Sequence, residues 1–188
     1  MDDKLKKHET IAACGIDCGL CPRFYTKGNS ACPGCGGLNF KEKHPNCGVL
    51  TCCVIKNGFE TCAECKEFPC SRFKTGNAGC DSFTTHKKMN SNLNEIKTIG
   101  IEQFVEKQKI RIDILCNLLT NYDNGRTKSF FCQTCALFPI DKLQEIHKEL
   151  ITTDANADLK EINIIARKLI TKTANTIGVD LKLNKKIK

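Results

Sequence analysis

Long hydrophobic runs are missing from this sequence of 188 residues. No stretch of about 18 apolar residues occurs, which excludes a membrane-spanning helix. Residues 1–10 (MDDKLKKHET) are polar and lack the apolar centre of a secretory signal peptide. The cysteine count, 15, is odd. These features favour reduced thiols in the cytoplasm over the disulfide scaffold of a secreted protein.

Recognisable catalytic motifs are missing as well. The sequence has no Ser-His-Asp set, no phosphate-binding glycine loop, no HExxH motif and no pair of catalytic carboxylates. The four histidines are scattered and offer no evident general base; they are His8, His44, His86 and His147. This pattern favours a binding protein over an enzyme and leaves any reaction undefined.

Large apolar residues are scarce in the first half of the chain. A core this small rarely contributes more than about 3–5 kcal/mol, so such domains need an additional source of stability. One structural zinc ion contributes an apparent ~10–16 kcal/mol of coupled binding and folding. We therefore predict that the first half depends on bound metal for its fold.

Cysteine is what this half has in abundance. A Cys-x2-Cys pair places two thiolates on one tight turn, so that both reach a metal at about 2.3 Å. Three such pairs and two looser ones fall between residues 14 and 70, and they predict about two structural zinc ions. The ten candidate ligands are Cys14, Cys18, Cys21, Cys32, Cys35, Cys47, Cys52, Cys62, Cys65 and Cys70.

Spacing also suggests how these thiols divide between ions. It favours a first ion held by Cys18, Cys21, Cys32 and Cys35. A second ion would be held by Cys47, Cys52, Cys62 and Cys65. Cys14 and Cys70 would then be spare, exchange with a neighbour or share a third ion, and His44 could replace one thiolate.

Two alternatives to structural zinc stay open. The Cys21-Pro22 and Cys32-Pro33 pairs are similar to the Cys-Pro of bacterial cluster motifs, which favours an iron–sulfur redox or sensor protein. A metalloenzyme is the other alternative, with an open position on one ion. In that case Arg126 and Lys128, in a turn before a helix, would bind an anionic small substrate.

The second half has helical periodicity. Apolar residues from Ile101 to Leu119 recur at i, i+3, i+4 and i+7 and predict an amphipathic helix of about twenty residues. Gly100 ends the helix before it, and a turn follows near residues 122–125. Asp141 is predicted to cap a later helix, and Asp154 or Asp158 the last one.

Three further cysteines fall on these predicted helices. Cys132 and Cys135 resemble a redox dithiol in spacing, but no βαβ pattern surrounds them. We interpret them as a buried helical pair, and Cys116 on the long helix in the same way, because free cysteine packs as a small hydrophobic residue.

The expected fold is therefore mainly α. An irregular, knuckle-rich metal-binding region (1–84) packs on a helical region (85–178) that forms a bundle of about four helices, and a basic tail (179–188) follows. The formal net charge of +8 falls to roughly +4 once two tetracysteine zinc sites are counted. The basic excess lies in the helical half. This favours a protein partner over nucleic acid, since a nucleic-acid-binding finger needs a basic face beside its knuckles.

Four segments resemble a known family, the cysteine-rich bacterial and archaeal proteins called domain of unknown function 3795. They are residues 13–22 (ACGIDCGLCP), 32–35 (CPGC), 59–70 (FETCAECKEFPC) and 122–132 (YDNGRTKSFFC). The resemblance covers most of residues 12–145, and the second zinc ribbon of some members is absent here. It implies zinc binding and no particular reaction.

Overall fold

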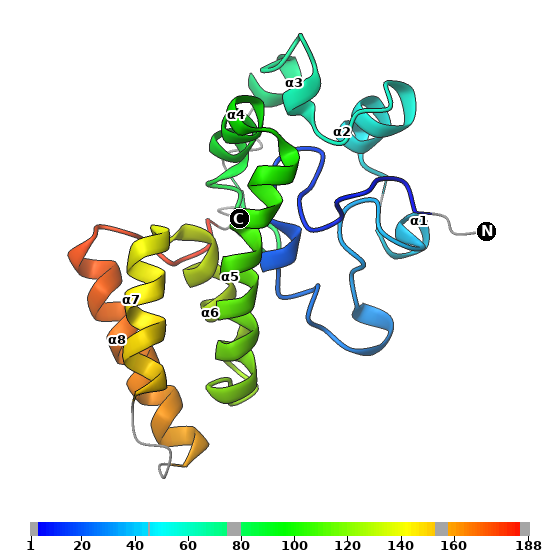
Figure 1. Cartoon of the computed structure of the whole chain (residues 1–188). Helices are drawn as coiled ribbons and strands as arrows, with labels where there is room; N and C mark the ends of the chain where they lie inside the picture. Colours follow the sequence, from blue (N-terminus) through cyan, green and yellow to red (C-terminus); the bar gives the residue numbers. More distant parts are fainter. Residues whose placement is uncertain (1–3, 45, 75–79, 153–157, 185–188) are drawn as a thin grey trace.

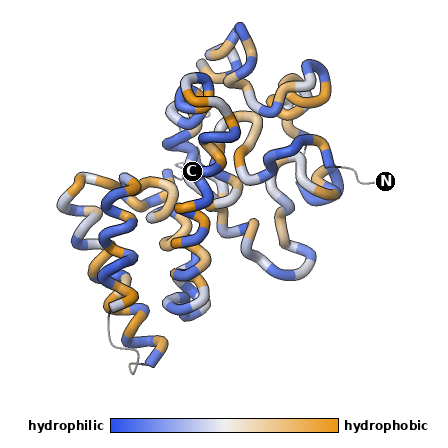
Figure 2. Tube along the Cα trace, in the orientation of Figure 1, coloured by the Kyte–Doolittle hydropathy of each residue, from blue (hydrophilic) through white to orange (hydrophobic). Residues whose placement is uncertain are grey.

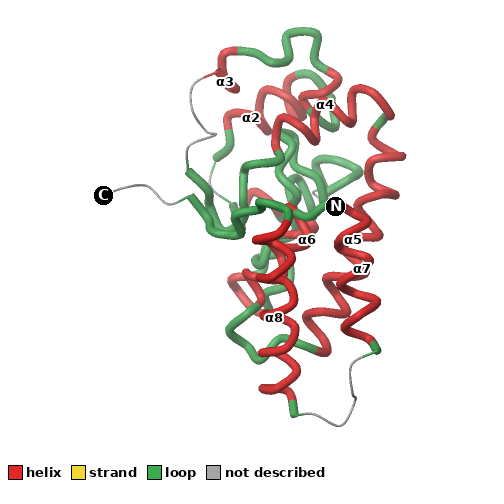
Figure 3. Tube along the Cα trace, turned by 90° about the vertical axis from the view of Figure 1, so that its left-hand side faces the viewer, coloured by secondary structure: helices red, strands yellow, loops and turns green. Residues whose placement is uncertain are grey.

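A long central helix, α5 (Ile101–Asn121), is the axis of the fold (Figure 1). The computed structural model describes residues 4–44, 46–74, 80–152 and 158–184. Around α5 lie four further helices, α4 (Met89–Ile99), α6 (Lys128–Leu137), α7 (Ile140–Ile151) and α8 (Leu159–Thr176). The predicted mainly α fold is confirmed. Figure 3 draws no strand in the described part of the chain. The only strand-like pairing there is one antiparallel bridge between Ile11 and Asp17.

The predicted boundaries of α5 are confirmed. Gly100 has a left-handed backbone (φ 84°) and separates α4 from α5, and the helix ends before Tyr122. Its buried face carries Phe104, Leu115 and Leu118 at helical spacing. Gln108 lies on the same face and is equally buried, although its side chain is polar.

The largest core lies between the C-terminal helices. α5 contacts α6 and α7, and α7 contacts α8. Each helix turns an apolar side inward, which is visible along α7 and α8 as alternating hydrophobic and hydrophilic segments (Figure 2). The fully buried side chains of this core include Leu115, Leu118, Phe131, Leu143 and Ile170.

The three helical cysteines do not share one environment. Cys132 and Cys135 are fully buried in the helical core, as predicted. The prediction for Cys116 was wrong, because its side chain is exposed. It follows Leu115 directly, and one residue along a helix turns the side chain by about 100°. Leu115 faces the core, so Cys116 is turned away from it.

Two predicted helix starts have different outcomes. Asp158 caps α8, where its carboxylate accepts a hydrogen bond from the Glu161 N–H at 2.8 Å. Asp141 does not cap α7, because that helix begins at Ile140 after Pro139. Asp141 therefore lies in the first turn, where its negative charge still faces the positive end of the helix dipole.

Replacing the α8 cap is expected to destabilise the protein. Asp158→Ala should lower the free energy of unfolding by about 1 kcal/mol, because the Glu161 N–H loses its acceptor. Urea denaturation followed by circular dichroism measures this change. Asp141→Ala is the matched control, since it removes a first-turn carboxylate that is not a cap. Equal losses in the two variants would contradict the capping role.

The N-terminal half is irregular, as predicted, and appears in blue to cyan in Figure 1. Its helical pieces are single turns joined by loops, so backbone ladders contribute little to its order. They are η1 (Cys18–Leu20), η2 (Gly28–Ser30), α1 (Phe40–Lys43), α2 (Gly48–Leu50), the wide turn η3 (Thr51–Lys56), η4 (Cys62–Glu64) and α3 (Ser71–Lys74).

The two halves are joined by buried polar contacts. The Asp17 carboxylate accepts hydrogen bonds from Asn92 Nδ2 on α4 at 2.8 Å and from Gln108 Nε2 on α5 at 2.9 Å. Burial raises the pKa of the Asp17 carboxyl, and these two amides partly oppose the shift. Next to Asp17, η1 contacts α5 and α6 and inserts Leu20 into the helical core.

The C-terminal segment returns to the connection between the halves. The Asp81 N–H donates to the Asn184 carbonyl at 2.8 Å, and Lys87 Nζ donates to the Asp180 carbonyl at 2.9 Å. The described part of the basic tail, residues 179–184, is thus held in place by hydrogen bonds. Residues 185–188 lie outside the described part of the chain.

Candidate metal centre

One group of thiols surrounds the first knuckle. Cys14, Cys18, Cys35 and Cys47 pack around one small apolar cluster with Ala13. Burial raises the pKa of the Cys14 thiol to about 12, and the neighbouring thiols of Cys35 and Cys47 add to the shift. Burial also raises the pKa of Cys18, with Cys35 as the next cause. These four thiols are therefore close enough to influence one another.

Cys21 and Cys32 are neighbours of each other and of the first group, because the Cys21 thiol adds to the rise in the pKa of Cys18 and the Cys32 thiol to that of Cys35. The Cys32 N–H donates to the Arg23 carbonyl at 3.0 Å, which brings the second knuckle alongside the first. Burial raises the pKa of the Cys21 thiol, and the neighbouring Cys32 thiol adds to the shift.

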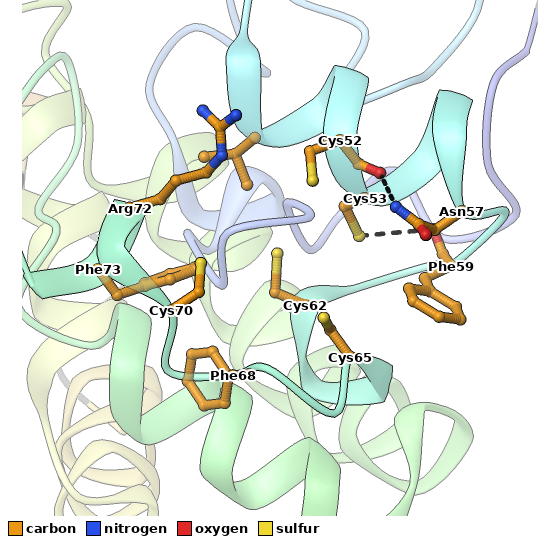
Figure 4. Close-up of a pocket in the computed structure, with 11 residues that line it drawn as sticks. Cys52, Cys53, Asn57, Phe59, Cys62, Cys65, Phe68, Cys70, Arg72 and Phe73 are labelled. Carbon is orange, nitrogen blue, oxygen red and sulfur yellow. Dashed lines mark hydrogen bonds between the residues drawn. The ribbon is translucent and has the colours of Figure 1, made fainter.

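A second group of thiols lines a cavity of about 40 Å³, which we call the thiol cavity. Five cysteines from three segments line it (Figure 4); they are Cys52, Cys53, Cys62, Cys65 and Cys70. Its volume suits a few atoms, such as an ion, and not an organic molecule. Its donor set is sulfur, which is the ligand type of structural zinc.

Local structure presents these thiols to the cavity. Cys52 and Cys53 lie on η3, and Cys62 begins η4. The Glu64 carboxylate accepts from the Thr61 N–H at 2.8 Å and so fixes the start of η4. A hydrogen bond with the Cys53 side chain raises the pKa of Cys62, and burial adds to it.

The first set of thiols that spacing favoured, Cys18, Cys21, Cys32 and Cys35, are neighbours in the structure. The second set differs from the predicted one at two positions. Cys70 shares the thiol cavity with Cys52, Cys62 and Cys65, whereas Cys47 lies by Cys14. The reason is that the chain folds back on itself. The Cys62 N–H donates to the Ala13 carbonyl at 2.9 Å, so partners come from distant parts of the sequence.

The geometry is that of neighbouring thiols and not of closed coordination shells. Across the described ranges, no three cysteine, histidine, aspartate or glutamate side chains converge closely enough to hold one ion. His44 is exposed and stacks on the Phe40 ring with centroids 4.7 Å apart. The ten predicted ligands thus gather in one half of the molecule, and the assignment of ligands to ions stays a prediction.

A buried lysine lies among these cysteines and was not found by the sequence reasoning. Lys6 is 5 % exposed, and its Nζ donates to the Ile11 carbonyl at 2.6 Å. Its charge lowers the pKa of the Cys35 and Cys62 thiols and so opposes the effect of burial. Among the described residues, no carboxylate lies within ion-pair distance of it. In the sequence, Lys6 resembles any other lysine of a charged segment.

The predicted anion-binding turn has its own internal hydrogen bonds. The Asp123 carboxylate accepts from two N–H groups of the turn, and Asn124 Oδ1 accepts from the Arg126 N–H at 3.2 Å. The Arg126 side chain is exposed, and Lys128 Nζ donates to the Tyr25 carbonyl at 3.1 Å. Lys128 therefore links the halves, and a role of the two cations in anion binding stays a prediction.

These features define a class: a cysteine-rich, mainly helical protein whose thiols gather in one irregular half. Within that class, residues 10–75 match the family model described as protein of unknown function (DUF3795). The match confirms the resemblance for the cysteine-rich motifs, and the motif at residues 122–132 lies outside the matched range. The match spans every candidate ligand from Cys14 to Cys70. No curated protein and no solved structure matches the chain. No helix in the described ranges combines the length and the apolar character needed to cross a membrane.

Proposed function

We propose that this protein binds about two zinc ions through its N-terminal cysteines and that these ions hold together a module for binding another protein. The observation that carries the proposal is the thiol cavity, where five thiols from three separate segments line a space of about 40 Å³. Such a cavity suits a metal ion better than any organic ligand.

The buried Lys6 supports metal bound by thiolates. A buried ammonium group without a negative partner is costly. A zinc ion with four thiolates carries a net charge of about −2, which the Lys6 charge partly compensates. The approach of Lys6 to Cys35 and Cys62 is thus explained by negative charge on the sulfur atoms in the metal-bound protein.

Metal binding requires modest side-chain movement. Each thiol must bring its sulfur to about 2.3 Å from the ion, whereas the sulfurs now lie around the cavity without a common ligand distance. Cysteine reaches new positions by rotation about a single χ1 bond.

A protein partner is supported by the helical half. A shallow hollow between α5 and α7 is lined by the apolar side chains Ile110 and Ile151, which are 41 % and 57 % exposed. Asp113 and Lys148 line the same hollow with opposite charges. A nucleic-acid surface would instead carry charge of one sign.

The test is metal analysis of protein prepared without oxygen. We expect a colourless protein with about two zinc ions per chain. Cys70→Ser should weaken the binding of one ion, because it removes a thiol from the cavity. Cys116→Ser is the matched control, since Cys116 is exposed on α5 and should leave the zinc content unchanged.

Two outcomes would contradict the proposal. A brown protein with visible absorption and bound iron would establish the iron–sulfur alternative in place of zinc. A chain that contains no metal and binds none on titration would remove metal binding altogether. Zinc content and affinity that are equal in Cys70→Ser and in the unchanged protein would exclude Cys70 as a ligand, and the same result for Cys62→Ser as well would exclude the thiol cavity as a site.

A further inference from the structure

A second cavity, of about 390 Å³, lies where the cysteine-rich half meets α4 and α5. We call it the Asp17 cavity. Its described lining residues include no cysteine, so it is separate from the proposed metal sites. Its volume falls in the range of small-molecule sites, which is about 300–1,000 Å³.

The floor of this cavity is the buried carboxylate of Asp17, which has acceptor positions that no amide hydrogen bond uses. Asp17 is 8 % exposed and accepts one amide hydrogen bond on each oxygen, from Asn92 and from Gln108. An ionised carboxylate offers about four acceptor positions. Two of them stay open toward a ligand in the cavity.

Beside Asp17 lies an acceptor without a donor. Gln108 is 2 % exposed, and its Nε2 donates to Asp17 Oδ1 and to the Thr10 carbonyl at 3.1 Å. No donor in the described part of the chain reaches Gln108 Oε1. A buried unpaired acceptor costs about 1–3 kcal/mol. This oxygen is closed to solvent and does not face the cavity, so Gln108 contributes to the site by holding the Asp17 carboxylate in place.

The rim of the cavity has the opposite charge. Lys107 is engaged with Glu95 at 2.8 Å. Lys88 and Arg111 also line the cavity, and the positive charge of each lowers the pKa of the Asp17 carboxyl. Arg111 Nη1 donates to the Cys135 and Phe138 carbonyls, which uses two of its five N–H donors. The remaining donors and the Lys88 ammonium can bind an anionic group.

An apolar wall completes the cavity between the floor and the rim. It is formed by Phe104 and Ile110 on α5, Ala136 on α6 and Ile140 at the start of α7. This wall suits a hydrocarbon side chain, because its burial there removes apolar surface from water.

We propose that the Asp17 cavity binds a free α-amino acid with an apolar side chain. The ammonium group donates to the Asp17 carboxylate, which Asn92 and Gln108 hold in place. The carboxylate faces Lys88 and Arg111, and the side chain packs against Phe104 and Ile140. A single small molecule thus satisfies the open acceptors, the cationic rim and the apolar wall together.

Calorimetric titration of the purified full chain tests this assignment. L-Leucine and L-phenylalanine are the probes, and at least one of them is expected to bind. N-Acetyl-L-leucine lacks the ammonium group and L-leucinamide lacks the carboxylate. Each derivative should bind at least tenfold more weakly, because it loses a charge-assisted contact. Failure of both amino acids to bind, or equal binding of the derivatives, overturns the proposal.

Substitutions of single lysines test whether the amino acid binds in this cavity. Lys88→Ala should weaken binding by about tenfold or more, since it removes a rim cation. Lys97→Ala is the matched control, because Lys97 lies exposed on α4, the helix that follows Lys88, and does not line the cavity. Both variants remove a partly or fully exposed lysine and are expected to fold. Equal affinities in the two variants would exclude the Asp17 cavity as the site. The titration uses zinc-loaded protein, because Asp17 lies in the half that the proposed ions are expected to stabilise. A zinc-loaded chain that binds neither amino acid would contradict this proposal and leave the metal proposal standing.

Discussion

Treatment with a strong chelator is expected to unfold residues 4–74 while α5 to α8 keep their structure. The two halves differ in their source of stability. The helices enclose a core of fully buried side chains such as Leu115, Phe131 and Leu143. The cysteine-rich half has only single helical turns and small apolar clusters. We therefore expect its fold to depend on the proposed ions, because the coupled binding and folding of one structural zinc ion is worth an apparent ~10–16 kcal/mol.

Hydrogen exchange followed by mass spectrometry measures the unfolding of each segment separately. Peptides from residues 4–44 and 46–74 should lose most of their protection after chelation, and peptides from α5 and α6 should change little. Return of zinc should restore the protection. The same chelator saturated with zinc serves as the control. Full protection of the N-terminal peptides in metal-free protein would show that apolar packing alone maintains this half.

The substitution Gly15→Ala is expected to disrupt the packing between the two halves and so to lower the free energy of unfolding. Gly15 has a left-handed backbone (φ 88°) and lies against α4. A Cβ atom there would overlap the Met89 carbonyl oxygen and lie 2.8 Å from Leu93 Cγ. The backbone cost is about 1–2 kcal/mol, and forcing an extra group into a packed contact costs about 1–3 more. We expect a total loss of about 2–5 kcal/mol in the free energy of unfolding.

The measurement is urea denaturation of zinc-loaded protein, with Gly28→Ala as the control. Gly28 also has a left-handed backbone (φ 75°), but no described atom lies within 4 Å of the position that a Cβ atom would take there. The control should lose only the backbone contribution of about 1–2 kcal/mol. If the two variants were equally stable, the close packing of Gly15 on α4 would be refuted.

The helical half could be predicted from the sequence because its signals are local. The apolar stripe of α5, the stop at Gly100 and the cap at Asp158 each depend on residues within a few positions of one another. The prediction that Asp141 caps α7 also depended on local signals, and it was wrong. Pro139 starts α7 two residues earlier, and proline and aspartate are both typical of a helix start.

The grouping of the second set of thiols could not be predicted, because it depends on where the chain folds back. Spacing within a knuckle is a local property, but the approach of Cys70 to Cys52 is not. The Asp17 cavity was also missed, although one signal was present. Gln108 interrupts an apolar stripe, and a polar residue on a buried face requires partners from another part of the chain. The identity of that partner, Asp17, was not accessible from one sequence.

The separations of these contacts along the chain imply an order of events during synthesis on the ribosome. All ten candidate ligands emerge before α4 begins at Met89, and cysteines within a knuckle meet over loops of two to four residues. The bonds from Asp17 to Asn92 and Gln108 close over 75 and 91 residues and must wait for α5. If the proposed zinc ions bind, the nascent chain can acquire them first and dock its N-terminal half onto the helices afterwards. A shortage of zinc would then leave the N-terminal half unfolded while the helical half is still being synthesised.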